Sequence, residues 1–265
     1  MILDEIADRT RERVRARKVE EPLKELRARV RELPIHREAD RPFPFARALG
    51  GEKMSFICEV KQASPSKGVI APHFPYEAIA AEYEAAGADA ISVLTEPYYF
   101  KGSNDYLRAI RGRVRIPLLR KDFTVDEYMI WEAKEIGADA VLLICAILSP
   151  AELKEYMGIA EELGLSALVE AHDEREVEMA LTAGARIIGV NNRNLKDFTV
   201  DIGNSVRLRR MVPPEILFVS ESGMKTRADI AALEQNGTNA VLIGETLMRS
   251  EDKAAMLREL AGEKK

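Results

Sequence analysis

Polar and charged side chains stand at the ends of short apolar runs that have the composition of β-strands. The set comprises Glu59 and Lys61 after FIC, Lys121 after LLR, Glu170 after ALV, Asn191 after IGV, and Glu221 with Ser222 after FVS. A single Lys or Glu at a strand end is as often a solvated surface side chain. If the strand ends meet, however, lysines and glutamates perturb each other's pKa values by charge and desolvation. Such a cluster supplies general acids and general bases near neutral pH and predicts proton-transfer chemistry.

Glycines after the last two apolar runs indicate an anion site. Gly223 follows Ser222, and Gly244 precedes Glu245. A tight turn explains either glycine alone, but the pair on neighbouring strands exposes backbone N–H groups and helix starts toward an anion. The loop 64–68 (SPSKG) adds hydroxyl groups and a cation. We therefore expect a phosphorylated small-molecule substrate.

A recurring phrase predicts the elements that must position these residues. A helix-like stretch ends in glycine and an apolar run follows, in AAGADAISVL, EIGADAVLLI, TAGARIIGV and QNGTNAVLIG. The phrase returns about every 50 residues, and the apolar runs between its copies bring the expected strands to eight. Amphipathic segments separate the strands, at 76–86, 125–136, 150–163 and 226–235. Strands this apolar are buried on both faces, so the pattern favours an α/β fold, a closed (β/α)8 TIM barrel with its active site at the C-terminal strand ends.

The first 48 residues do not fit the repeat. Residues 2–33 are highly charged with apolar residues at helical spacing, and 34–45 is interrupted by proline. We expect an N-terminal helical extension over 1–48 and a barrel over 49–265, together forming one structural domain. The extension carries an arginine run: Arg9, Arg11, Arg13, Arg15 and Arg17. Acidic residues are interspersed among these arginines, so we expect the run to be a solvated helix face with no chemical role.

The composition excludes several classes of partner. The chain is 46% apolar and 31% charged with a net charge of -5, so no overall basic field attracts nucleic acid. No stretch approaches the roughly 18 apolar residues of a membrane span, and no apolar leader begins the chain. We expect a cytoplasmic protein without nucleic-acid or membrane partners, and a monomer.

Cysteine and histidine usage predicts neither a disulfide nor a metal site. Cys58 and Cys145 lie inside apolar runs, which is typical of buried reduced thiols. The histidines His36, His73 and His172 are far apart and form no zinc-ligand pair. We expect no metal.

The sequence resembles the indole-3-glycerol-phosphate synthase family through seven segments spread over the barrel. They are CEVKQASPSKG (58–68), LTEPYYFKGS (94–103), LLRKDF (118–123), LVEAHDE (168–174), GVNNRNL (189–195), SESG (220–223) and IGETLMR (243–249). The resemblance implies a carboxy-lyase of tryptophan biosynthesis that works without cofactor or metal. Its reaction converts 1-(2-carboxyphenylamino)-1-deoxyribulose 5-phosphate into indole-3-glycerol phosphate, carbon dioxide and water.

The same resemblance implies roles for the site residues. Lys121 is the general acid on the keto oxygen in ring closure, and the proton transfers of dehydration are divided among Lys61, Glu59 and Glu170 in an order left open. An equal alternative for Lys61 is to hold the substrate carboxylate as a point charge. Orienting hydrogen bonds come from Asn191, Glu221 and Ser222. The expected substrate and phosphate contacts are Ser64, Arg193, Gly223, Gly244 and Glu245, and the expected aromatic slot is Phe100, Phe123, Leu142 and Leu195. For Leu142, core packing explains the residue equally well.

Two other functions remain open. An enzyme resembling phosphoribosylanthranilate isomerase would need an Asp and a Cys, but Cys58 lies three residues before Lys61. A non-catalytic or redesigned barrel would bind a phosphorylated metabolite without turnover. The presence of Lys121 argues against that alternative, because its loss with the phosphate glycines retained would mark such a protein.

Overall fold

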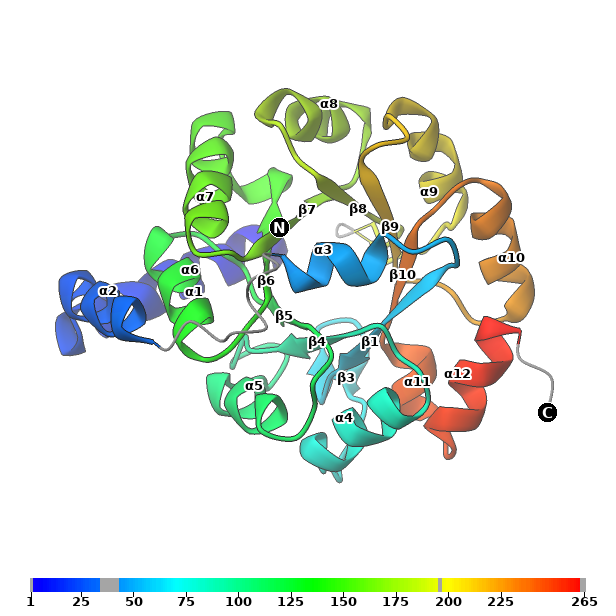
Figure 1. Cartoon of the computed structure of the whole chain (residues 1–265), viewed down its shortest axis with the longest axis horizontal. Helices are drawn as coiled ribbons and strands as arrows, with labels where there is room; N and C mark the ends of the chain where they lie inside the picture. The colour runs from blue at the N-terminus through cyan, green and yellow to red at the C-terminus, as the bar shows by residue number, and fades with distance from the viewer. Residues whose placement is uncertain (1, 34–42, 195–196, 263–265) are drawn as a thin grey trace.

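The computed structural model describes residues 2–33, 43–194 and 197–262. Eight parallel strands close into a barrel in the order β1-β10-β9-β8-β7-β6-β5-β4, with helices around it (Figure 1). The barrel strands are β1 (Ser55–Val60), β4 (Ala90–Leu94), β5 (Leu118–Lys121), β6 (Ala140–Ile144), β7 (Ser166–Ala171), β8 (Ile187–Asn191), β9 (Leu217–Glu221) and β10 (Ala240–Ile243). The helices that cover it are α4 (Tyr76–Ala85), α5 (Asn104–Arg111), α6 (Glu127–Glu135), α7 (Pro150–Glu162), α8 (Glu174–Ala183), α9 (Gly203–Leu208), α10 (Arg227–Gln235), α11 (Glu245–Arg249) and α12 (Lys253–Ala261), with 3-10 turns η2 (Cys145–Ile147) and η3 (Arg209–Met211). The predicted (β/α)8 barrel is confirmed.

Both faces of the strands are apolar because both are covered. In β1, Ile57 belongs to the cluster inside the barrel, whereas Cys58 packs in the layer between strands and helices. Side chains alternate across a strand, so one run of apolar residues supplies two cores. At the C-terminal mouth, three strands end in polar residues: Lys121, Asn191 and Glu221.

The repeated glycines end helices. Gly87, Gly137, Gly184 and Gly237 all have positive φ, with values of 92°, 89°, 88° and 78°. A residue in the left-handed region stops a helix and turns the chain into the next strand, and glycine adopts it without a Cβ penalty. The repeat in the sequence is therefore the helix-to-strand turn of successive βα units.

A short helix and a small hairpin add to the barrel. Helix α3 (Pro44–Leu49) lies across the N-terminal end, where Phe45 and Leu49 are fully buried against the interior cluster (Figure 1). The hairpin of β2 (Ala63–Ser64) and β3 (Gly68–Val69) was not predicted. Two residue pairs form it, too few for an alternating pattern to be visible in the sequence.

Helices α1 (Ile2–Glu20) and α2 (Leu23–Glu32) precede the barrel, and α2 lies outside the ring beside α6 (Figure 1). Their apolar residues pack against Tyr128, Met129 and Trp131. The prediction that the arginine run is a solvated face is wrong for Arg13, whose side chain is 18% exposed and donates to Asp122 at 2.9 Å. Asp122 is buried, and its carboxylate needs a compensating cation, which the guanidinium of Arg13 supplies. Among the described residues, every helix is too short or too polar to span a bilayer.

Candidate active site

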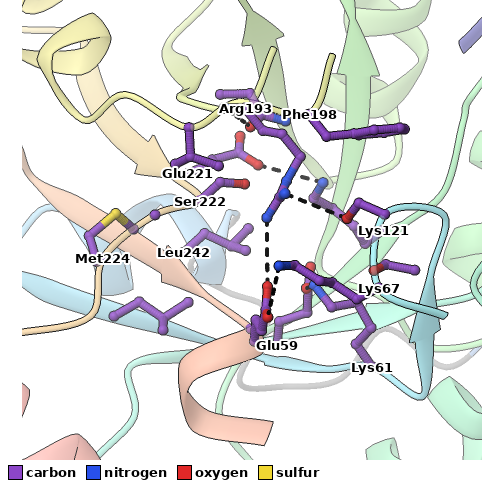
Figure 2. Close-up of a pocket in the computed structure, with 18 of the residues that line it drawn as sticks. Glu59, Lys61, Lys67, Lys121, Arg193, Phe198, Glu221, Ser222, Met224 and Leu242 are labelled. Atoms are coloured by element: carbon purple, nitrogen blue, oxygen red, sulfur yellow. Dashed lines mark hydrogen bonds and ion pairs between the residues drawn. The ribbon is translucent and has the colours of Figure 1, made fainter. Parts of the chain in front are cut away.

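A cavity of about 900 Å³ opens at the C-terminal mouth of the barrel (Figure 2). Its walls include all the predicted site residues that the structure describes: Glu59, Lys61, Ser64, Phe100, Lys121, Phe123, Leu142, Glu170, Asn191, Arg193, Glu221, Ser222, Gly223, Gly244 and Glu245. Leu195 lies outside the described residues. The strand ends thus bring together side chains that stand up to 186 residues apart, as Glu59 and Glu245 do.

Lys121 lies between two buried carboxyl groups. Its Nζ is 3.4 Å from Glu170 Oε2 and 3.5 Å from Glu221 Oε2. Burial opposes the charge of Lys121, but Glu170, Glu221 and Glu59 outweigh it and raise the pKa of the ammonium group. Lys121 is therefore a protonated donor and a poor general base.

The two carboxyl groups beside Lys121 take opposite protonation states. Burial works against the charge of Glu170, but Lys121, His172 and a hydrogen bond with Asn191 lower its pKa. Burial and the neighbouring charge of Glu170 raise the pKa of Glu221 to about 8. Near neutral pH, Glu170 is therefore ionised and can accept a proton, whereas Glu221 is protonated and can donate one. One cluster thus contains both a base and a donor.

Glu59 and Lys61 form a second pair across the mouth (Figure 2). Both point inward from the end of β1, two residues apart, and their side chains are 5% and 15% exposed. A Cβ at Gly244 would collide with Glu59 Oε1 and lie 2.8 Å from Lys61 Nζ. The backbone after β10 thus passes directly over this ion pair because residue 244 has no side chain.

Arg193 extends into the cavity from the loop after β8 (Figure 2). Its backbone N–H donates to Asn191 Oδ1 at 3.0 Å, which fixes the amide that hydrogen-bonds Glu170. Its guanidinium lies 3.8 Å from Glu245 Oε2 and donates weakly to Ser66 Oγ at 3.5 Å. Arg193 therefore connects the loops after β1, β8 and β10 at the rim.

The turn after β9 has an unusual backbone. Ser222 has φ 68° and Gly223 has φ 98°. The buried Asn192 donates to the Ser222 carbonyl at 3.0 Å and to Ser220 Oγ at 3.0 Å, holding the turn. A non-glycine residue in the left-handed region costs free energy, so this network keeps Ser222 beside the cavity.

The apolar wall includes residues that the sequence analysis missed. Phe100 and Phe123 face each other with centroids 6.0 Å apart. Leu3 and Ile6 of α1 complete the wall beside them. The amphipathic spacing of α1 could signal that it packs on something, but not that its target is the mouth of the barrel.

The closed parallel barrel and the buried lysine and carboxylate cluster at its C-terminal mouth define a (β/α)8-barrel enzyme. Residues 3–260 match the family model of indole-3-glycerol phosphate synthase. The chain belongs to the indole-3-glycerol phosphate synthase family.

Relatives of that name match along the whole chain. The indole-3-glycerol phosphate synthase of Ruminiclostridium cellulolyticum is 57% identical over 262 residues, covering 99% of each chain. That of Leuconostoc mesenteroides is 53% identical over 266 residues, covering 100% of each. A solved 3-hexulose-6-phosphate synthase from Salmonella typhimurium has TM-score 0.65 and 14% identity, covering 79% of this chain and 97% of its own. The last similarity concerns the fold alone.

The raised pKa of Glu221 predicts a pH-dependent stability difference. The folded protein holds a proton at Glu221 up to about pH 8, whereas the unfolded chain releases it near 4.5. The stability from this group is therefore fully present below 4.5 and lost as pH rises through 8. Glu221→Gln stays neutral, so its melting temperature relative to wild type should increase from about pH 5 to about pH 8. The exposed Glu178→Gln is the control, and a Glu221→Gln difference that is constant with pH would contradict the pKa.

Gly189→Ala should displace the Glu221 carboxyl group from its position in the cavity wall. A Cβ at this position in β8 would overlap Glu221 Oε1 and lie 3.1 Å from Leu168 Cδ1. We expect a lower melting temperature and a lower kcat, because the Glu221 carboxyl must move away from Lys121. Gly158→Ala in α7, where nothing lies within 4 Å, is the matched control and should lose neither. Full activity in Gly189→Ala would show that the Glu221 position is not critical.

Proposed function

We propose that this chain forms indole-3-glycerol phosphate from 1-(2-carboxyphenylamino)-1-deoxyribulose 5-phosphate, with Lys121 as general acid and Glu170 as general base. The observation that carries the proposal is the position of the Lys121 ammonium, 3.4 Å from the ionised Glu170 and 3.5 Å from the protonated Glu221. Acid and base stand ready in one buried cluster.

Lys121 acts in ring closure. The aromatic carbon that bears the carboxylate attacks the keto carbon, while Lys121 delivers a proton to the keto oxygen. The new carbon–carbon bond disrupts the aromatic ring, and loss of carbon dioxide restores it. The slot of Phe100, Phe123 and Leu142 holds the aromatic ring dry and in contact with the keto carbon, which lowers the entropy cost of attack.

Dehydration follows at the same mouth. The hydroxyl formed in ring closure must leave as water with one proton, and the ring-closed intermediate must lose another. We assign the first transfer to Lys61, whose ammonium lies beside Glu59, and the second to Glu170, whose low pKa makes it the available acceptor. Asn191 and Ser222 orient the substrate oxygens between the two pairs.

The phosphate is assigned to the loops after β1, β9 and β10. Ser64 offers a hydroxyl, and Gly223 offers a backbone N–H in the turn after β9. Gly244 and Glu245 offer backbone N–H groups at the start of α11. The Glu245 carboxylate accepts from Arg249 at 3.1 Å. Its charge is thus partly neutralised, so its backbone N–H can serve the phosphate.

The test is to incubate chelator-treated protein with the carboxyphenylamino-deoxyribulose phosphate and to follow indole fluorescence. We expect saturable formation of indole-3-glycerol phosphate that does not depend on added metal. Tight substrate binding without indole product would instead favour the non-catalytic barrel.

We also propose a cytoplasmic monomer without nucleic-acid partners, in which 1–48 and 49–265 fold as one unit. The net charge of -5 and the packing of Val14 and Leu26 against Trp131 support this proposal. Light scattering at the mass of one chain and a single cooperative unfolding transition are the expected results. A dimer mass, or separate melting of the extension, would contradict it.

A further inference from the structure

We propose that His172 is a positioning residue that holds Glu170 ionised and fixes its orientation toward Lys121, through a chain of contacts from Glu176 to His172 to Glu170. The inference rests on the proposed role of Glu170 as the general base. His172 does not line the cavity, and it lies too far from His36 and His73 in the sequence to form a zinc-ligand pair.

The two oxygens of Glu170 face different partners. Oε2 lies 3.4 Å from Lys121 Nζ, whereas Oε1 lies 3.4 Å from His172 Nε2. Residues 170 and 172 project to the same side because side chains alternate along an extended chain. The carboxylate is therefore held between a cation in the cavity and a ring behind it.

Glu176 sets the orientation of the ring. Its Oε2 accepts from the backbone N–H of His172 at 2.8 Å and lies 3.0 Å from ring Nδ1. Because a carboxylate accepts, Nδ1 carries the proton and Nε2 is the atom left to face Glu170. The backbone is fixed as well, because Asn204 donates to the His172 carbonyl at 3.0 Å and the Glu176 N–H donates to Asp173 at 2.9 Å.

The surroundings of the ring are acidic. The titratable groups that face this cluster are Glu170 on β7, Glu176 and Asp173 at the start of α8, Glu221 on β9, Lys121 on β5 and Cys145 on η2. Burial opposes the charged imidazole, but the hydrogen bond with Glu176 and the charges of Glu170 and Glu176 raise the pKa of His172. In turn, the positive charge of His172 helps to lower the pKa of Glu170. His172 Nε2 is buried and makes no hydrogen bond within the described residues, so its contact with Glu170 Oε1 at 3.4 Å is an ion pair when the imidazole is protonated.

The expected effect is a shift in the pH dependence of turnover. Without the imidazolium, Glu170 takes up a proton at higher pH and stops acting as a base. For His172→Asn and His172→Gln, the acid limb of the kcat profile should move up by about one pH unit, as expected for loss of one neighbouring charge. KM should change little, because His172 does not contact the cavity. Glu176→Gln should move the limb in the same direction by less.

The experiment uses the full chain and two readouts. The first is kcat and KM against pH for the His172 and Glu176 variants, with His73→Asn as the control, since His73 is exposed. The second is an NMR titration of the imidazole nitrogens of the wild type, which has three histidines, with His172→Asn assigning the signal. We expect a His172 midpoint above the ordinary value of 6.5 that falls in Glu170→Gln.

The outcomes separate this inference from the proposed function. If Glu170→Gln abolishes turnover while both His172 variants keep the wild-type pH profile, the positioning role is overturned and the base role stands. A His172 midpoint that is unchanged in folded Glu170→Gln also overturns it. If Glu170→Gln keeps full turnover, the proposed base role itself fails and the inference falls with it.

Discussion

Replacing Lys121 by alanine lowers kcat by about 100- to 10,000-fold, the usual contribution of a positioned general acid. The ammonium is the protonated donor of the cluster, and its removal leaves Glu170 and Glu221 without their shared cation. Binding of a phosphate-bearing substrate analogue should weaken much less, because Gly223 and Gly244 remain in place. The measurements are kcat from indole fluorescence and the analogue Kd from calorimetry.

A lysine outside the cavity provides the control. Lys154 is exposed on α7, and Lys154→Ala should leave kcat and Kd unchanged. Equal losses of turnover and analogue binding in Lys121→Ala would refute the general-acid role, since a group that acts only in the transition state affects kcat selectively.

Of the substitutions proposed here, replacing Asp122 by alanine should cause the largest loss of stability. We expect the free energy of unfolding to fall by about 3–5 kcal/mol, because the substitution removes one partner of a buried ion pair. Asp122 is 1% exposed and accepts from Arg13 at 2.9 Å and from Thr95 at 2.7 Å, with Arg120 at 3.6 Å. Its removal leaves buried Arg120 with less compensating charge and detaches α1 from β5. Urea unfolding measures the effect.

Asp105→Ala is the comparison for that variant. Asp105 pairs with Arg108 on the surface at 2.9 Å, but its side chain is 80% exposed, so its loss should change little. Because Leu3 and Ile6 of α1 line the cavity, Asp122→Ala should also raise KM. Equal midpoints for the two variants would show that the Arg13–Asp122 pair does not hold the extension.

The sequence predicted the strand-end residues because their pattern is local. Glu59, Lys121 and Glu170 each follow an apolar run, and the closed barrel brings such ends together whatever lies between them. The protonation states could not be predicted, because they depend on distances across the cavity: Glu170 and Glu221 have the same side chain, yet their pKa values move in opposite directions.

Contacts between distant segments were less visible. Arg13 looks like its solvated neighbours until Asp122, 109 residues later, is placed beside it. His172 gave a local signal, since it stands two residues after Glu170 at the end of the same strand. That spacing could have identified His172 as a partner of Glu170, but it could not have predicted the contact of His172 with Glu176.

The pairing of the first barrel strand with the last has a consequence for the growing chain on the ribosome. Ser55 pairs with Ala240, and Gly244 passes over Glu59 and Lys61. A nascent chain that has not yet reached β10 can pair β1 only with β4, and it lacks the turn at Gly244 that passes over Glu59 and Lys61. Such non-local pairing is typical of slow folding steps. The cavity is therefore complete only late in translation, when the C-terminal segment packs against residues that were synthesised much earlier.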